Sequence, residues 1–148
     1  MDLTVKTFAE LSARELYEIL RTREAVFIVE QNCPYPEADG KDYDAVHLYY
    51  AADSGEVKAY LRLYWKDGEP GTVQIGRVVT SPDVRGTGLG RIIFQDGIRY
   101  ALEGMGAKRL CLNAQVQALG FYAKEGFTVS SDVFLEDDIP HVEMRRDA

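Results

Sequence analysis

Cysteine is scarce in this 148-residue chain, and long apolar runs are missing. The two cysteines, Cys33 and Cys111, have neither CxxC spacing nor a nearby pair of histidines, so nothing supports a disulfide framework or a zinc site. No stretch approaches the roughly 20 apolar residues that a membrane span needs, and the N-terminus lacks the basic and apolar regions of a signal peptide. We therefore expect reduced thiols, no bound metal, no membrane partner and a cytoplasmic location.

Clusters of positive charge are also missing. The formal net charge is -7, and the longest Lys/Arg cluster is Arg145-Arg146 near the C-terminus. A protein that binds nucleic-acid phosphates without regard to sequence needs more clustered positive charge than this, so no nucleic-acid partner is expected. The negative field suits a cationic small substrate better, although acidity also serves solubility.

The acidic loop at residues 37–44 carries four carboxylates and one glycine, a composition that suggests calcium. An EF-hand loop that began at Asp39 would place Lys41 and Tyr43 where carboxylate or amide ligands are needed. The spacing therefore argues against a metal site. We expect this loop to be solvated or to face a substrate.

Hydrophobic residues make up 46% of the chain and charged residues 28%, with no Pro/Ser/Gly-rich tract and no repeat. These values are typical of an ordinary globular protein. The length falls within the usual range of one domain, so a single domain over residues 1–148 is expected.

Period-two alternation and turn residues predict most of the strands. Residues 3–8 alternate apolar and polar side chains, as a half-buried strand does. Three further strands, at 47–52, 57–65 and 72–80, are joined by turn-rich segments and indicate an antiparallel meander. Shorter strands are expected at 109–113, 127–129 and 142–144.

Three helical regions complete the pattern. Ser12 and Glu15 form a capping box that begins the first, whose apolar face is broken by the polar residues 21–24, so one long helix or two short ones are both open. The second spans 89–103 and ends at glycines. The third spans 118–124. This order of elements favours a mixed sheet in an α/β (α+β) domain over a doubly wound fold.

The segment at residues 76–90 carries the clearest chemical signal. A strand runs into a turn that places Gly86, Gly88 and Gly90 at the start of the best helix. Backbone N–H groups and the positive end of a helix dipole form a pyrophosphate site there, and Arg85 adds a charged donor. Neither the P-loop nor the dinucleotide pattern matches this spacing. A tight turn that needs glycine only for its backbone angles is the alternative.

Two motifs together resemble the GNAT N-acetyltransferase superfamily. Arg85-x-x-Gly88-x-Gly90 resembles its coenzyme A pyrophosphate loop, and the second motif, with Gln115 where Asn is more usual, is Gln115-x-x-Ala118-x-x-Phe121-Tyr122-x-Lys124-x-Gly126-Phe127. Segments 26–35, 39–42, 76–79 and 136–141 are similar to the ElaA-like branch of that superfamily. The resemblance implies the GNAT fold, a mixed and mostly antiparallel central sheet flanked by helices, with acetyl-CoA as co-substrate and no metal.

The resemblance also implies roles for individual residues. Tyr122 is expected to face the thioester sulfur and to act as the acid that protonates the departing thiolate, while the strand at 78–80 bonds the pantetheine arm. The residues expected to bind the coenzyme are Val78, Val79, Arg85, Gly86, Thr87, Gly88, Gly90, Gln115 and Tyr122.

A general base is needed when the acceptor is a basic amine, because an ammonium cannot attack a thioester. The sequence offers Glu30, His47 and His141, and spacing selects none of them. Arg77 is a charged residue in an apolar strand; it either pairs with a carboxylate from Glu30 or from residues 39–44, or lies exposed.

The sequence therefore predicts an N-acyltransferase that moves an acetyl group from acetyl-CoA to an amine by direct attack. The acceptor is a small molecule or a peptide amine, and a homodimer is compatible with this. Two alternatives stay open: a non-catalytic acyl-CoA-binding or regulatory module, and a protein-lysine acetyltransferase.

Overall fold

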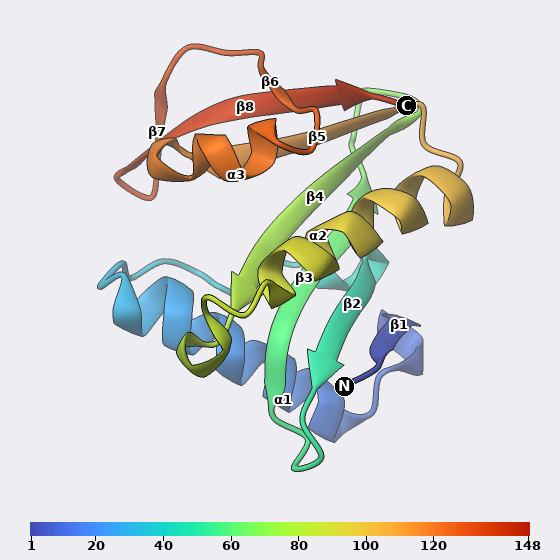
Figure 1. The fold of residues 1–148 in the computed structure, drawn as a ribbon, viewed down its shortest axis with the longest axis vertical. Coiled ribbons are helices and arrows are strands. Elements are labelled where there is room, and N and C mark those ends of the chain that lie inside the picture. Colours follow the sequence, from blue (N-terminus) through green and yellow to red (C-terminus); the bar gives the residue numbers. More distant parts are fainter.

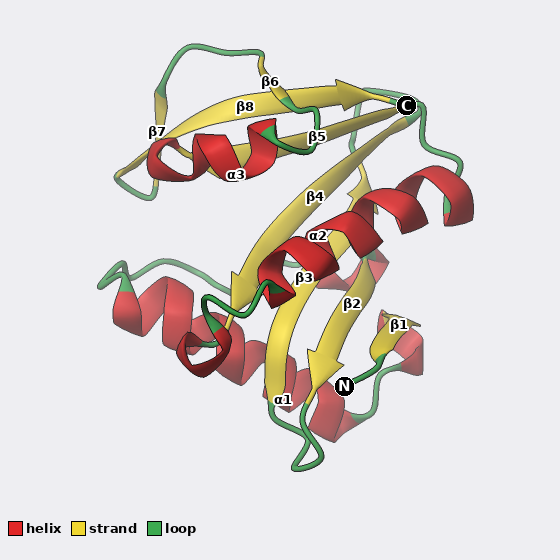
Figure 2. Ribbon diagram, viewed as in Figure 1, coloured by secondary structure: helices red, strands yellow, loops and turns green.

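The computed structural model describes residues 1–148. Its eight strands form one sheet of order β1-β2-β3-β4-β5-β8-β6, and β7 also pairs with β8 (Figures 1 and 2). Only the β4–β5 pair is parallel. The mixed, mostly antiparallel sheet that the sequence predicts is therefore confirmed. The strands are β1 Leu3–Thr7, β2 Val46–Ala51, β3 Val57–Trp65, β4 Thr72–Thr80, β5 Arg109–Gln115, β6 Thr128–Val129, β7 Phe134–Glu136 and β8 Ile139–Asp147.

Helices lie against both faces of the sheet (Figure 2). The predicted capping box begins α1, Ala13–Arg23, where the Ser12 hydroxyl accepts from the Glu15 N–H and the Glu15 carboxylate accepts from the Ser12 N–H. A π-helical turn, Glu24–Glu30, continues α1 without a break, so the first helical region is one helix. The others are α2, Leu89–Arg99, extended by a second π-helical turn over Tyr100–Gly104, and α3, Leu119–Ala123.

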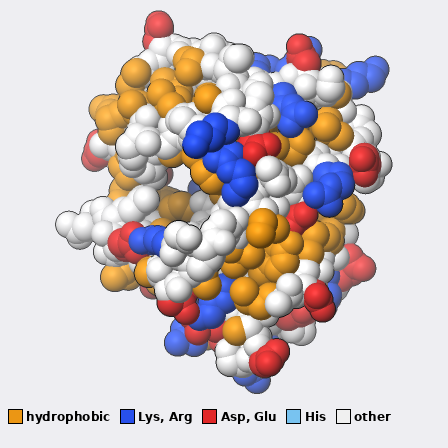
Figure 3. All heavy atoms as spheres, in the orientation of Figure 1, with side chains coloured by type: hydrophobic (Ala, Val, Ile, Leu, Met, Phe, Trp, Pro, Cys, Tyr) orange, Lys and Arg blue, Asp and Glu red, His pale blue; other side chains and the backbone are white.

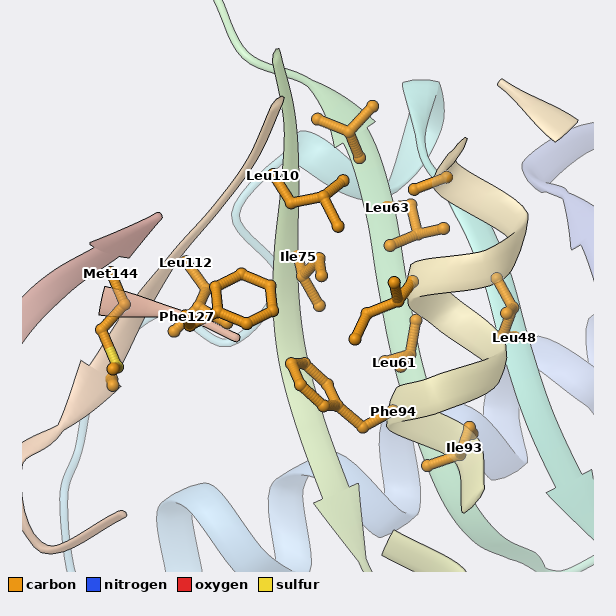
Figure 4. Packing of buried hydrophobic residues seen from close by; sticks show 14 of the residues in the cluster. Leu48, Leu61, Leu63, Ile75, Ile93, Phe94, Leu110, Leu112, Phe127 and Met144 are labelled. Carbon is orange, nitrogen blue, oxygen red and sulfur yellow. The ribbon is translucent and has the colours of Figure 1, made fainter. Parts of the chain in front are cut away.

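The main core lies between the sheet and α2. Alternate side chains of β3 and β4, among them Leu61, Leu63 and Ile75, meet Ile93 and Phe94 of α2 (Figure 4). A smaller cluster that includes Ile19 and Tyr60 packs α1 on the opposite face. Burying both faces of the central strands explains why β3 reads as a nearly continuous apolar run in the sequence.

The C-terminal hairpin was only partly predicted. β8 is longer than the expected 142–144, and β7, which the sequence analysis did not predict, pairs with it across a turn at Asp137 and Asp138. Both aspartates have positive φ, 50° and 63°, a conformation that Asp tolerates better than most residues. Two adjacent aspartates predict a loop, and the sequence around them does not predict strands. The strands on each side form because β7 and β8 pair with one another.

The two halves of the sheet separate along β4 and β5. The strands pair only where Thr72–Gln74 lies beside Arg109–Cys111, and beyond this point β4 continues beside β3 and β5 beside β8 (Figure 1). β4 also has a bulge where it leaves β5. The β3–β4 register shifts between Tyr60 and Arg62, and Arg77 on the β4 side has a φ of 53°. The C-terminal half of β4 thus has one edge with no strand beside it.

Candidate active site

Two connected hollows occupy the opening between β4 and β5. The first, here called the central cavity, has a volume of about 290 Å³, and Figure 3 shows the surface hollowed between α3 and the end of β4. Its lining includes Phe27, Arg77, Val78, Val79, Arg85, Gln115, Tyr122, Glu136 and His141. The second, the side pocket, has a volume of about 320 Å³. The residues that line both hollows are Tyr35, Ile75, Gly76, Arg77, Asn113, Glu136 and Asp137. The site therefore draws on segments far apart in the sequence.

The glycine loop before α2 has the backbone that phosphate binding requires. Gly86 and Gly88 have φ of 80° and 86°, and a Cβ at either position would meet no atom within 4 Å. Gly88 caps α2, so the unpaired N–H groups of the first turn face solvent together with the positive end of the helix dipole. The Thr87 hydroxyl donates to the Val84 carbonyl at 2.5 Å and stabilises the turn. An anion has open access to this backbone.

Gly90 and the free edge of β4 connect this loop to the central cavity. Gly90 lies in the first turn of α2, where a Cβ would be 3.4 Å from the Thr80 side chain, so the helix starts close to the strand end. Val78 and Val79 line the cavity, and β3 occupies only one side of this part of β4. An extended chain could therefore pair with the opposite edge as an added strand does.

Glu30 does not line the central cavity. It ends the π-helical turn and forms a bidentate ion pair with Arg85, with nitrogen–oxygen distances of 2.8 and 3.0 Å. Both side chains are about two-fifths exposed. The structure thus places Glu30 against a predicted coenzyme ligand, and this geometry does not support Glu30 as the base.

Tyr122 projects from α3 into the central cavity. Its ring packs edge-on against Phe94, with centroids 5.1 Å apart, and against Phe121 at 5.2 Å. Burial alone raises the pKa of Tyr122 to about 12, so the phenol keeps its proton at neutral pH. The side chain is therefore held as a neutral hydrogen-bond donor in the cavity.

His141 lies on β8 with its ring buried beside the cavity. Its Nδ1 is 2.7 Å from the Ile139 carbonyl, which can only accept, so Nδ1 carries the proton in the neutral ring. Nε2 is left with its lone pair, 3.4 Å from the Glu136 carboxylate. Phe134 stacks on the ring at 6.1 Å and fixes its plane. A neutral His141 can accept a proton at Nε2, and Glu136 would stabilise the resulting cation.

The sequence analysis did not identify Glu136 as a functional residue. Its carboxylate also accepts from the Asn113 amide at 3.3 Å and borders both hollows. The β7–β8 hairpin pairs Glu136 with Ile139 and leaves its carboxylate 3.4 Å from Nε2 of His141, so recognising that hairpin in the sequence would have pointed to this contact. His47, by contrast, is fully buried, hydrogen-bonded to the Tyr60 hydroxyl and the Asp42 carbonyl; burial lowers its pKa. His47 lines neither hollow and has a structural role.

Gln115 ends β5 at the rim of the central cavity. Its amide donates to the Gln31 side chain at 3.3 Å and its carbonyl accepts from Gln117 at 2.5 Å. Cys33 lies nearby but outside the cavity, and its thiol donates to the Asp137 carbonyl at 3.1 Å. The segment after α1 is thus connected to three other parts of the site. Glu30 contacts Arg85 beside the glycine loop, Gln31 contacts the end of β5, and Cys33 contacts the β7–β8 hairpin.

The acidic loop is neither free in solvent nor arranged around a metal. Arg23, which is fully buried, contacts Glu37 at 2.7 Å and Asp42 at 2.8 Å, and Arg62 contacts Asp39 at 2.6 Å. Burial opposes ionisation of Asp42, but the two arginines outweigh it and hold its pKa below the usual range. No group of three or more His, Cys, Asp or Glu side chains is arranged to bind a metal ion, and no helix is long and apolar enough to cross a membrane.

Arg77 joins this ionic cluster to the cavity. Its guanidinium contacts Glu37 at 2.9 Å and Asp39 at 3.4 Å and lies 5.5 Å from the Tyr35 ring centroid. Asp39 lies in the region that the sequence analysis proposed for its partner. The bulge at positive φ is what directs the side chain there, so Arg77 shapes the wall between the two hollows.

Comparison with known proteins shows the family of this chain. The family model of the acetyltransferase (GNAT) domain matches residues 9–148. The chain belongs to the GNAT family. Within this family, the chain belongs to the ElaA-like branch. The crystal structure of Escherichia coli ElaA is 34% identical in sequence to this chain, and the two superpose with a TM-score of 0.91 over 99% of both chains.

Two further relatives cover nearly the full length. An acyl-CoA N-acyltransferase from Pseudomonas aeruginosa is 42% identical, with a TM-score of 0.91 over 99% of both chains. A UPF0039 protein of Schizosaccharomyces pombe is 40% identical over 146 residues, which is 98% of this chain and 96% of that protein. The GNAT fold of this chain is therefore established over its length.

Proposed function

We propose that this GNAT protein transfers the acetyl group of acetyl-CoA to an amine by direct attack. The observation that carries the proposal is that Arg85 beside the glycine loop, the free edge of β4, Tyr122 and His141 all line one cavity. A structural relative described as an acyl-CoA N-acyltransferase supports the same class of reaction. The acetyl donor and the amine acceptor are the finer parts of the proposal.

The residues present fit acetyl-CoA. The N–H groups of Gly86, Gly88 and Gly90 at the start of α2 would bind the pyrophosphate with Arg85 beside it, whereas the Thr87 N–H already donates to the Val84 carbonyl. The edge of β4 at Val78 and Val79 would bond the pantetheine arm, and Gln115 lies across the cavity from it. When bound, the coenzyme supplies an acetyl thioester, whose carbonyl oxygen a β4 N–H would polarise.

His141 would supply the free amine. An alkyl ammonium of pKa ~10.4 is neutral in only about one molecule in 2,500 at pH 7, which corresponds to about 4 to 5 kcal/mol. Nε2 of His141 would remove one proton, the amine nitrogen would then form a bond to the acetyl carbon as the carbon–sulfur bond breaks, and the second proton of that nitrogen would pass to solvent. Glu136, 3.4 Å away, stabilises the imidazolium.

Tyr122 would stabilise the departing sulfur. A thiol of pKa near ~8.5 is a stronger acid than a phenol whose pKa is raised to about 12, so complete proton transfer from Tyr122 to sulfur is uphill. We therefore assign Tyr122 as a hydrogen-bond donor to the thiolate, which takes its proton from solvent after it leaves. This refines the general-acid role that the sequence suggests.

A non-catalytic coenzyme-binding module is the competing function. It would need the glycine loop but neither a buried donor nor a base in the same cavity, and both Tyr122 and His141 line it. A coenzyme-release assay with a panel of amines, amino acids and basic peptides separates the two. Release with any acceptor supports the transferase; acetyl-CoA binding by calorimetry without release from any acceptor would favour the binding module.

A further inference from the structure

The side pocket is the candidate binding site for the acceptor. It opens beside the central cavity, and none of the residues proposed to bind the coenzyme lines it. Gly76 lines the side pocket with its backbone, because it has no side chain. A Cβ added there would lie 3.5 Å from Nε of Arg62, which is ordinary van der Waals contact. The space is thus about the size of a small polar molecule.

One wall of the side pocket carries surplus positive charge. Arg62 is only 2% exposed, pairs with Asp39 and Asp42, and still has an Nε–H without an acceptor. The three arginines of the ionic cluster, Arg23, Arg62 and Arg77, are matched by three carboxylates, Glu37, Asp39 and Asp42.

Lys41 adds one positive charge beside these three arginines and three carboxylates, whose charges balance. Its ammonium forms no ion pair and lies 5.5 Å from the centre of the Tyr64 ring. Lys41 therefore leaves this wall with a net positive charge that has no partner in the chain.

The part of the lining that comes from the β7–β8 hairpin is negative. Glu136 and Asp137, on the β7–β8 hairpin, both line the side pocket, and no lysine or arginine pairs with either of them. Glu136 is also the carboxylate beside Nε2 of His141. A cation held by this wall lies next to the proposed base.

We propose that the acceptor is a zwitterion of the amino-acid class, with its ammonium group on the Glu136–Asp137 wall and its carboxylate on the Lys41–Arg62 wall. This inference rests on the proposed function. The separated charges complement each end of such a molecule, whereas a simple diamine would place a cation against Lys41. Lys41 is then a specificity residue that touches the acceptor but takes no part in the chemistry.

Matched substrates test this charge pattern. Coenzyme release is measured with amino acids and with their carboxamides, which keep the amine, the size and the side chain but lose the negative charge. The wild-type protein should favour the acids by at least tenfold in kcat/KM. Lys41→Gln should reduce that preference severalfold through KM, and Lys41→Glu should reverse it, while Lys108→Gln, an exposed lysine at the other end of the sheet, should leave it unchanged.

The outcomes separate the inference from the proposed function. Equal rates for acids and amides, or a preference that Lys41→Gln and Lys41→Glu leave intact, would overturn the zwitterion assignment and leave acetyl transfer standing. No release from either series, with acetyl-CoA still bound in calorimetry, would overturn the proposed function and this inference with it.

Discussion

Glu30 and Arg85 form a bidentate ion pair across the mouth of the cleft, with contacts of 2.8 and 3.0 Å. The pair joins the π-helical turn after α1 to the loop that we assign to the coenzyme pyrophosphate. A phosphate that binds the Arg85 guanidinium competes with the Glu30 carboxylate, which already occupies two of its five N–H donors. Glu30 is therefore a competitor of the coenzyme in the free protein.

Replacing Glu30 by Gln should strengthen acetyl-CoA binding. Exposed ion pairs contribute about 0.2 to 1 kcal/mol, so the gain should be at most about fivefold in Kd, measured by calorimetry. Glu24→Gln, at the other end of the same turn, is the control and should change nothing. Turnover should persist in Glu30→Gln; its loss would return Glu30 to consideration as the base.

Replacing Gly88 by Val should block the phosphate site. The bulky side chain would stand at φ 86° where the backbone is now open, so acetyl-CoA should bind at least tenfold more weakly, about 1.4 kcal/mol. Gly68→Val is a matched control, because Gly68 has φ 75° and open space in the distant β3–β4 turn. Both variants should lose similar stability to backbone strain, but only Gly88→Val should lose affinity. Equal affinity in the two would remove the pyrophosphate assignment.

Replacing Tyr122 by Phe should slow transfer without disturbing the site. The ring contacts with Phe94 and Phe121 persist, and burial alone accounts for the raised pKa of the phenol, so the fold should not depend on the hydroxyl. We expect kcat to fall about 10- to 10⁴-fold, with nearly unchanged acetyl-CoA affinity and acceptor KM. Unaltered kcat, in conditions where chemistry limits the rate, would make Tyr122 a packing residue.

Acid should weaken the protein partly through Glu15. Burial opposes its ionisation, but Lys6, the Ser12 N–H and Tyr49 outweigh this and lower the pKa of Glu15 to about 2. Because this folded value lies below the unfolded value near 4.5, the stabilisation is complete above about pH 4.5 and is lost as pH falls toward 2.

Glu15→Gln isolates that contribution, since Gln can still complete the capping box. In urea unfolding, the stability gap between wild type and variant should be largest near pH 7 and close as pH falls below 4. A gap that stays constant from pH 7 to 3 would show that the carboxylate charge contributes nothing.

Local patterns predicted the scaffold well. The ranges of β3 and β4 agree with the predicted 57–65 and 72–80, because alternation and turn residues are local signals. β7 was missed, since its residues are held by pairing with β8 rather than by their own propensity. Arg23 reads as a surface residue in the helix pattern, yet it is buried because Glu37 and Asp42 reach it from a distant loop.

The site was predictable to a similar extent. The glycine loop and Tyr122 follow from short motifs, and Arg85 beside that loop lines the same cavity as Tyr122. Spacing could not separate His47 from His141, because only the fold puts one ring against Tyr60 and the other beside the cavity. Glu30 and Arg85 are 55 residues apart, so their pairing had no signature in the sequence.

The most direct test of the proposed chemistry follows both products of one reaction. Wild-type protein is mixed with acetyl-CoA and the amino-acid and amide panel, and free thiol is measured together with the N-acetylated acceptor by mass spectrometry. The account predicts equal amounts of thiol and N-acetyl product, and a rate at least tenfold lower for Tyr122→Phe under the same conditions. Bound acetyl-CoA with no N-acetylated product from any amine, or an acetyl group retained on the protein itself, would contradict it.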